Sequence, residues 1–100
     1  MPAQAPAAAD VADMPTLLHA LSDPVRLEIV RQLKDAELTC GQLDLPVGKS
    51  TCSHHLKTLS AAGVIAEREQ GVRKYVRLRR AEVDRRYPGL LDSVLNGLSV

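Results

Sequence analysis

The sequence predicts a mainly α fold that carries one β-hairpin toward its carboxyl end. Apolar residues recur at helical spacing through much of the 100-residue chain. Two short segments then flank the dipeptide Gln70-Gly71, the pattern of a hairpin with a tight loop. The only aromatic residues are Tyr75 and Tyr87, so the core must consist of Leu, Val, Ile and Ala, which favours helices packed on helices. A chain of this length forms one domain.

The first residues differ from the rest in composition. Residues 1–13 are rich in Ala and Pro and have no apolar periodicity, so we expect a disordered tail followed by a domain over residues 14–100. The chain has no apolar run of about 18 residues and its start lacks the pattern of a signal peptide. We therefore expect a cytoplasmic protein with no membrane partner.

Two helices are predicted before residue 34. Met14 to Leu21 has apolar residues at helical spacing, with a proline tolerated in the first turn. Asp23 is a favourable N-cap and Pro24 suits the first position of the next helix. The apolar residues of this second helix are Val25, Leu27, Ile29, Val30 and Leu33.

Two further helices are predicted around a tight turn. Thr39 can cap a short helix over Cys40 to Leu45, which Pro46 and Gly48 end. The fourth helix covers about Ser50 to Ala62, with Lys49 as an alternative start, and stops at Gly63. At 100° per residue its inner stripe contains Cys52, Leu56 and Leu59, and its opposite face is short, polar and basic.

The hairpin strands are VIAERE and VRKYVRL. In the second strand we expect Val72, Val76 and Leu78 on one face; on the other we expect Arg73, Tyr75, Arg77 and Arg79. The remaining residues predict a short helical turn that is interrupted at Tyr87-Pro88, followed by an apolar helix.

Charge is distributed unevenly along the chain. Residues 1–40 carry 3 basic and 6 acidic groups, residues 41–80 carry 8 and 3, and residues 81–100 carry 2 and 3, for a total of +1. The middle segment is thus 8 − 3 = +5. A basic block of this kind is typical of a polyanion binder, although a solvated basic face would look the same.

The order of elements predicts a winged helix-turn-helix that binds double-stranded DNA. A helix fits the major groove when a preceding helix braces it, and the hairpin then reaches neighbouring phosphates as a wing. His55 lies at the edge of the core, so a structural hydrogen bond is an equal alternative for it. The expected DNA contacts are Lys49, Ser50, Thr51, Ser53, His54, His55 and Lys57 from the fourth helix, and Arg68, Gln70, Arg73 and Lys74 from the hairpin.

The segments LSDPVRLEIVRQL, KSTCSHHLKTLSAAGVI and EREQGVRKYVRL resemble the ArsR/SmtB family of dimeric winged-helix repressors. The resemblance covers about residues 14 to 80 and is most specific over Ser50 to Gly63. It implies a homodimer on a palindromic operator, with the fourth helix in the major groove and the terminal helices at the dimer interface. The residues expected at that interface are Leu17, Leu18, Leu21, Leu90, Leu91, Val94 and Leu95.

The chain departs from the family at both of its familiar metal sites. A Cys-Val-Cys pair of arsenic-responsive members is replaced by Thr39-Cys40-Gly41, and residues 81–100 contain no His. We therefore expect no metal and no cofactor, and the sequence identifies no inducer. The turn before the fourth helix is also shorter than in many relatives, and Tyr87-Pro88 breaks what is often one long last helix.

Two alternatives to a simple repressor remain open. Cys40 and Cys52 fall at apolar positions of adjacent helices, where they are either buried thiols or a redox sensor. A disulfide requires Cα atoms within about 7 Å, which the sequence does not establish. A protein-interaction module that has lost DNA binding is the other alternative. No residue pattern indicates catalysis, so we expect no enzyme.

Overall fold

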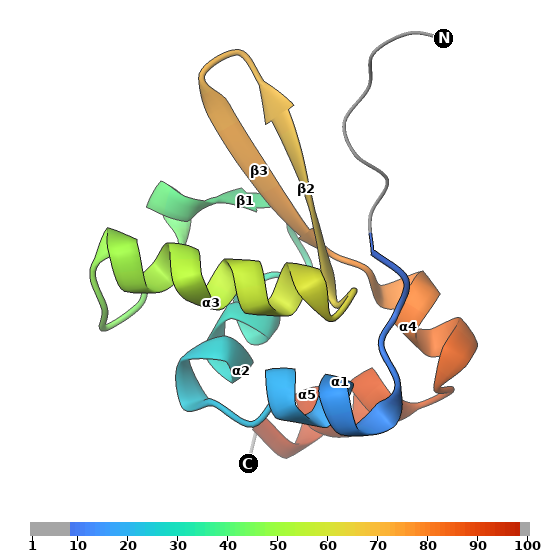
Figure 1. Ribbon diagram of the computed structural model, residues 1–100. Helices are drawn as coiled ribbons and strands as arrows, with labels where there is room; N and C mark the ends of the chain where they lie inside the picture. Colours follow the sequence, from blue (N-terminus) through green and yellow to red (C-terminus); the bar gives the residue numbers. More distant parts are fainter. Residues whose placement is uncertain (1–8, 99–100) are drawn as a thin grey trace, which may run out of the picture.

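The computed structural model describes residues 9–98, which form five α-helices and a small sheet whose hairpin extends away from the helices (Figure 1). The helices are α1 Met14–Ala20, α2 Pro24–Gln32, α3 Lys49–Ala61, α4 Arg80–Arg86 and α5 Leu90–Leu98. A short 3-10 helix, η1, covers Cys40–Gln42. The strands are β1 Leu38–Thr39, β2 Ile65–Gln70 and β3 Arg73–Leu78. This arrangement confirms the predicted winged helix-turn-helix.

The first two helices begin where the sequence predicts. The Oδ2 atom of Asp23 accepts hydrogen bonds from the backbone N–H groups of Val25 at 2.8 Å and Arg26 at 3.1 Å. Pro24 occupies the first helical position, where its missing N–H costs nothing. Asp13 caps α1 in the same way by accepting from the N–H of Thr16.

The end of α3 is closed by Gly63, as predicted. Its φ of +77° is left-handed, and the next N–H, that of Val64, donates to the Leu59 carbonyl at 3.0 Å. A Cβ on Gly63 would lie 2.5 Å from the Asp10 carbonyl oxygen, so the chain before α1 packs directly on this turn. The Ala12 N–H also donates to an α3-end carbonyl.

Residues 9–13, which the sequence analysis assigned to a disordered tail, instead contact the domain. Val11 is buried, and the hydroxyl of Tyr87 donates to the Ala12 carbonyl at 2.8 Å. Arg79 and Arg86 donate to carbonyls of the same segment. Residues 9–13 are held by polar contacts to distant side chains, which apolar periodicity does not reveal, and residues 1–8 lie outside the described part of the chain.

The sequence predicts a third helix over Cys40 to Leu45, but only its first turn forms, as the 3-10 helix η1. Leu43 already has extended backbone angles, with ψ of 127°, and Pro46 keeps the preceding Leu45 out of the helical region. The amide oxygen of Gln42 accepts from the Thr39 N–H at 2.8 Å, which supports the single turn.

The sheet has the order β1-β3-β2 and is antiparallel throughout. Gln70 pairs with Arg73, so the loop is Gly71 and Val72, one residue later than predicted. Gly71 has φ of +63°, as the first position of a type II′ turn requires. Val72 is consequently fully exposed in the turn, whereas Val76 and Leu78 are buried as expected. Strand β1 has only two residues, too few to show an alternating pattern.

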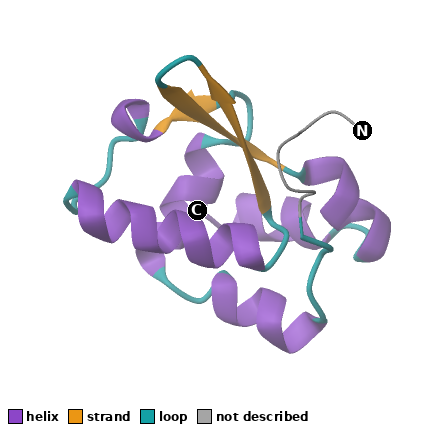
Figure 2. Ribbon diagram, turned by 45° about the horizontal axis from the view of Figure 1, so that its top comes forward, coloured by secondary structure: helices purple, strands orange, loops and turns teal. Residues whose placement is uncertain are grey.

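The helices gather on one side of the hairpin, which projects away from them (Figure 2). The interruption predicted at Tyr87-Pro88 separates α4 from α5, and α5 folds back against α2. Ile29 of α2, Leu59 of α3 and Leu91 of α5 are completely buried in the core. Over residues 9–98, no helix is long and apolar enough to cross a membrane.

Candidate nucleic-acid interface

Helix α3 has two faces with different chemistry. Its buried residues are Cys52, His55, Leu56 and Leu59. Its exposed polar residues are Lys49, Ser50, Thr51, Ser53, His54 and Lys57. The second set carries hydroxyl, imidazole and ammonium groups, which can bond to base edges and phosphates. The structure therefore brings six of the seven α3 residues predicted to contact DNA onto one solvent-facing surface, which we call the recognition face.

His55 is the exception. It is only 9% exposed, and its Nδ1 lies 3.1 Å from Nη1 of the buried Arg26. Since a guanidinium only donates, Nδ1 is the acceptor, and Nε2 lies 3.9 Å from an Asp23 carboxylate oxygen. Arg26 also donates from Nε to the Ala20 carbonyl at 2.7 Å. His55 thus joins α3 to the α1–α2 corner. This geometry favours the structural hydrogen bond, the alternative to a DNA contact for this residue.

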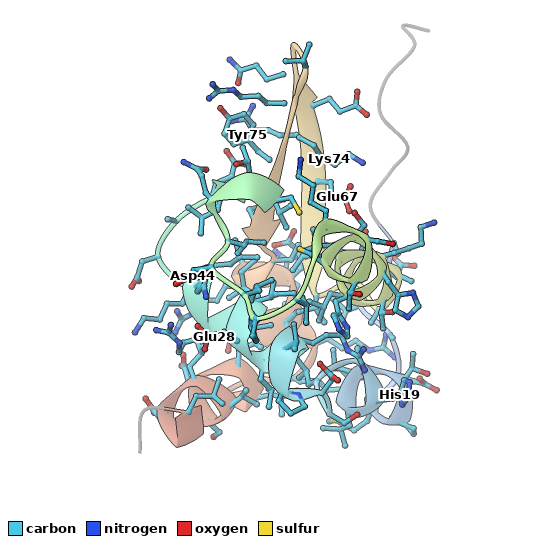
Figure 3. All side chains as sticks on the ribbon, turned by 90° about the vertical axis from the view of Figure 1, so that its left-hand side faces the viewer. His19, Glu28, Asp44, Glu67, Lys74 and Tyr75 are labelled. Atoms are coloured by element: carbon cyan, nitrogen blue, oxygen red, sulfur yellow. The ribbon has the colours of Figure 1, made fainter. Side chains whose placement is uncertain are left out.

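The turn before α3 is held by Gln32 of α2. Its side-chain amide donates to the Asp44 carbonyl at 2.8 Å and accepts from the Asp44 N–H at 3.0 Å. Glu28 accepts from the same amide at 2.7 Å and pairs with Arg31 (Figure 3). The hydrogen bonds from Arg31 and Gln32 lower the pKa of Glu28 to about 2. These contacts fix the loop that sets the start of α3.

The hairpin cations differ in how far their charge is already paired. Arg68 donates to both carboxylate oxygens of Glu37, at 2.7 to 3.0 Å, and lies over the Tyr75 ring at 4.5 Å. This hydrogen bonding lowers the pKa of Glu37. Gln70 accepts from Arg68 at 2.7 Å. The structure therefore gives Arg68 and Gln70 intramolecular partners, and their DNA contacts stay a prediction.

Four basic side chains stay exposed to an approaching anion. Lys74 lies 3.3 Å from a Glu67 carboxylate oxygen but is 57% exposed (Figure 3). Lys49, Lys57 and Arg73 are exposed, and none has a side-chain hydrogen bond or ion pair among residues 9–98. The recognition face therefore carries uncompensated positive charge, whereas the hairpin cations lie among the carboxylates Glu67 and Glu69.

The two thiols lie against each other beneath this surface. Cys40 Sγ and Cys52 Sγ are 3.2 Å apart, with Cys52 buried and Cys40 half-buried. Burial, followed by the hydrogen bond with Cys40, raises the pKa of Cys52 to about 12. Among the described residues, no three His, Cys, Asp or Glu side chains cluster as metal ligands do.

The apolar residues predicted at a dimer interface divide into two groups. Leu17, Leu21, Leu91 and Leu95 are buried within this single chain, and α5, which carries the last two, packs on α2. The interface expectation is corrected for these four. Leu18 is 48% exposed, and Leu90 and Val94 are partly exposed.

The exposed apolar surface also includes Met14, at 37% exposure, which the sequence analysis did not select. Met14 and Leu90 line the same surface hollow of about 460 Å³ between α1 and the start of α5. The helical stripe of α1 contained this residue, but only the fold shows that it stays uncovered.

The known proteins that this chain resembles are helix-turn-helix transcriptional regulators, in agreement with the geometry described above. Residues 21–68 match a family described as a helix-turn-helix domain. The HTH-type transcriptional regulator YceK of Bacillus subtilis (strain 168) is 39% identical over 82 residues, which cover 78% of this chain and 82% of that protein. The arsenical resistance operon repressor of Staphylococcus aureus is 30% identical over 90 residues, 88% of this chain and 79% of that one.

A solved structure shares the fold. The homodimeric winged helix-turn-helix DNA-binding domain of Mb0332 from Mycobacterium bovis superimposes with a TM-score of 0.71 at 24% identity, covering 85% of this chain and 77% of that one. The braced helix, its polar face and the basic hairpin define a winged-helix DNA-binding protein. The chain belongs to the ArsR/SmtB family of transcriptional regulators, a family of DNA-binding proteins.

Proposed function

We propose that this protein is a repressor that binds a palindromic operator as a homodimer, with α3 of each protomer in a major groove. The observation that supports it is the recognition face: an uninterrupted set of exposed polar and basic side chains on a helix whose opposite face is buried. Serine and threonine hydroxyls and the His54 imidazole read base edges, whereas Lys49 and Lys57 neutralise phosphates. In this proposal Arg73 and Lys74 contact the flanking backbone.

The dimer follows from the uncovered apolar surface. Met14, Leu18, Leu90 and Val94 lie on α1 and α5, and a domain of this size gains stability by covering such residues with a second copy. Two-fold symmetry then presents two recognition faces to two half-sites about one helical turn apart. The Mb0332 domain is homodimeric, which supports the same arrangement here.

The test is binding of the full chain to its own upstream DNA across a salt series. Lys57→Ala should lower the slope of log affinity against log salt by about two per dimer, because each protomer loses one phosphate contact. Arg85→Ala is the matched control, since Arg85 is an exposed cation on α4, outside the recognition face. Equal effects of the two variants, or binding that salt does not weaken, would contradict the proposal.

A further inference from the structure

The Cys40–Cys52 pair lies where a chemical change would reach the recognition face. Cys40 belongs to η1 and Cys52 to the first turn of α3, so the two sulfurs join the two helices of the helix-turn-helix. Their 3.2 Å separation is a direct thiol–thiol contact. A disulfide has an S–S length of about 2.05 Å, so the sulfurs need to approach by only about 1 Å.

The pair is reachable from solvent on one side only. Cys40 lines a groove of about 950 Å³ between α3 and the hairpin, whose other lining residues include Ser53, Lys57, Arg68 and Lys74. Cys52 is 4% exposed and does not line the groove. A small oxidant therefore meets the Cys40 sulfur first, with the Cys52 sulfur directly behind it.

We propose that Cys40 and Cys52 form an intramolecular disulfide in response to hydroperoxides, and that this oxidation releases the protein from DNA. The second half rests on the proposed DNA-binding function. In arsenic-responsive relatives the metal-binding cysteines correspond to Thr39 and Gly41, so Cys40 and Cys52 lie at other positions. A disulfide between them requires no third residue.

The reaction proceeds in two steps. The Cys40 thiolate attacks one oxygen of the peroxide, the O–O bond breaks, and Cys40 becomes a sulfenic acid while the leaving hydroxide takes up a proton to form water. The Cys52 sulfur then attacks the Cys40 sulfur, the S–S bond forms, the S–O bond breaks, and a second water leaves with the Cys52 thiol proton. Two thiols lose two electrons and two protons in total. The high pKa of Cys52 keeps this thiol protonated, so Cys40, which lines the groove, is the thiol that reacts first.

The disulfide acts on DNA binding through the start of α3. Leu56 and Leu59 anchor the later turns of α3 in the core. When the sulfurs approach each other, the segments that move are therefore η1 and the first turn of α3, which carries Lys49, Ser50 and Thr51. Hydrogen bonds to base edges tolerate only a few tenths of an ångström. A shift of about 1 Å in this turn therefore breaks them.

The experiment treats the full chain with hydrogen peroxide, removes the oxidant, and measures intact mass, alkylatable thiols and affinity for the upstream DNA. We expect a mass lower by two hydrogens, no covalently linked dimer on a non-reducing gel, and affinity at least about tenfold lower, a change of about 1.4 kcal/mol. Dithiothreitol should restore all three values. Bound DNA should also slow the alkylation of Cys40, because it covers the groove.

Two variants distinguish the possible outcomes. Cys40→Ser should bind DNA with the same affinity as the untreated wild-type protein and should lose the response to peroxide. Cys52→Ala should also lose the response, at some cost in stability because Cys52 is buried. Thiols that stay alkylatable, a disulfide between chains, or a disulfide that leaves affinity unchanged would each overturn the inference. If the reduced protein does not bind the upstream DNA, the proposed function is refuted. The intact mass still shows in that case whether the disulfide forms.

Discussion

Individual basic residues of the hairpin are not equivalent, although the sequence presents them alike. Arg68 is paired with Glu37 and covers Tyr75, whereas the Arg73 side chain has no partner among residues 9–98. A paired guanidinium contributes little field to an approaching phosphate, because the carboxylate cancels its charge. Charge counts along the chain therefore overstate how basic the hairpin is.

This difference gives a prediction for DNA binding. Arg73→Ala should weaken operator affinity by about tenfold per dimer, whereas Arg68→Ala should change it by less than about threefold. Titration of each variant with fluorescent operator DNA at constant salt measures both values. Thermal unfolding serves as the folding control, and a larger loss for Arg68→Ala than for Arg73→Ala would contradict the assignment.

Glu28 gives a prediction for the dependence of stability on pH. Its pKa is lowered from 4.5 to about 2 by bonds from Arg31 and Gln32, so the ionised form stabilises the fold above pH 4.5. That contribution is lost as pH falls from 4.5 toward 2. Because the pair is partly exposed, we expect only about 0.5 kcal/mol.

The measurement compares thermal unfolding of the wild-type chain and Glu28→Gln between neutral and acidic pH. The wild-type protein should be the more stable at neutral pH, and the two curves should converge toward pH 2 as Glu28 protonates. Asp13, Asp23, Glu37 and Glu82 also have lowered pKa values, but these carboxylates are common to both proteins and cancel. Parallel curves would show that Glu28 makes no ionic contribution.

At the scale of elements, α3 depends on both of its ends. Its start is set by the Gln32–Asp44 bonds and its end by the left-handed turn at Gly63, against which Asp10 and Val11 pack. The buried Arg26–His55 contact ties the middle of the helix to α2. These contacts come from four separate parts of the chain, so the orientation of the recognition face is a property of the assembled domain.

Gly63→Ala tests the closed end of α3. A methyl group there meets the Asp10 carbonyl at 2.5 Å in a backbone region that favours glycine, so we expect a loss of about 2 kcal/mol and a melting temperature lower by about 10 °C. Gly97→Ala is the control, because a Cβ on this α5 glycine meets nothing within 4 Å. An unchanged melting temperature for Gly63→Ala would show that the 10–11 segment does not pack as described.

At the scale of the whole molecule, the hairpin with the recognition face lies apart from the α1 and α5 surface (Figure 1). A charge placed on the α1 and α5 surface should therefore dissociate the proposed dimer without unfolding the chain. Leu18→Glu should raise the dimer dissociation constant by at least about tenfold, as measured by analytical ultracentrifugation.

Val72→Glu is the matched control for this variant. Val72 is equally apolar and fully exposed, but it lies at the tip of the hairpin. We expect it to leave the dimer intact. A Leu18→Glu protein that remains dimeric would show that another surface holds the two copies together.

Local sequence determined much of the fold of this protein. The caps at Asp23 and Gly63, the loop glycine at 71 and the apolar stripes of the helices act over a few residues, so their physics is readable in one segment. The polar face of α3 follows from the same period, because its six residues precede or interleave with buried ones at helical spacing. The broad location of the recognition face could therefore be predicted.

Only the tertiary structure decided which of these side chains are already occupied or covered. Glu37 pairs with Arg68 across 31 positions, Arg26 with His55 across 29, and the Cys40–Cys52 contact spans 12. The burial of Leu91 depends likewise on α5 folding back onto α2. Hydrogen bonds, ion pairs and burial depend on distance in space, and periodicity along a chain contains no information about which distant groups become neighbours.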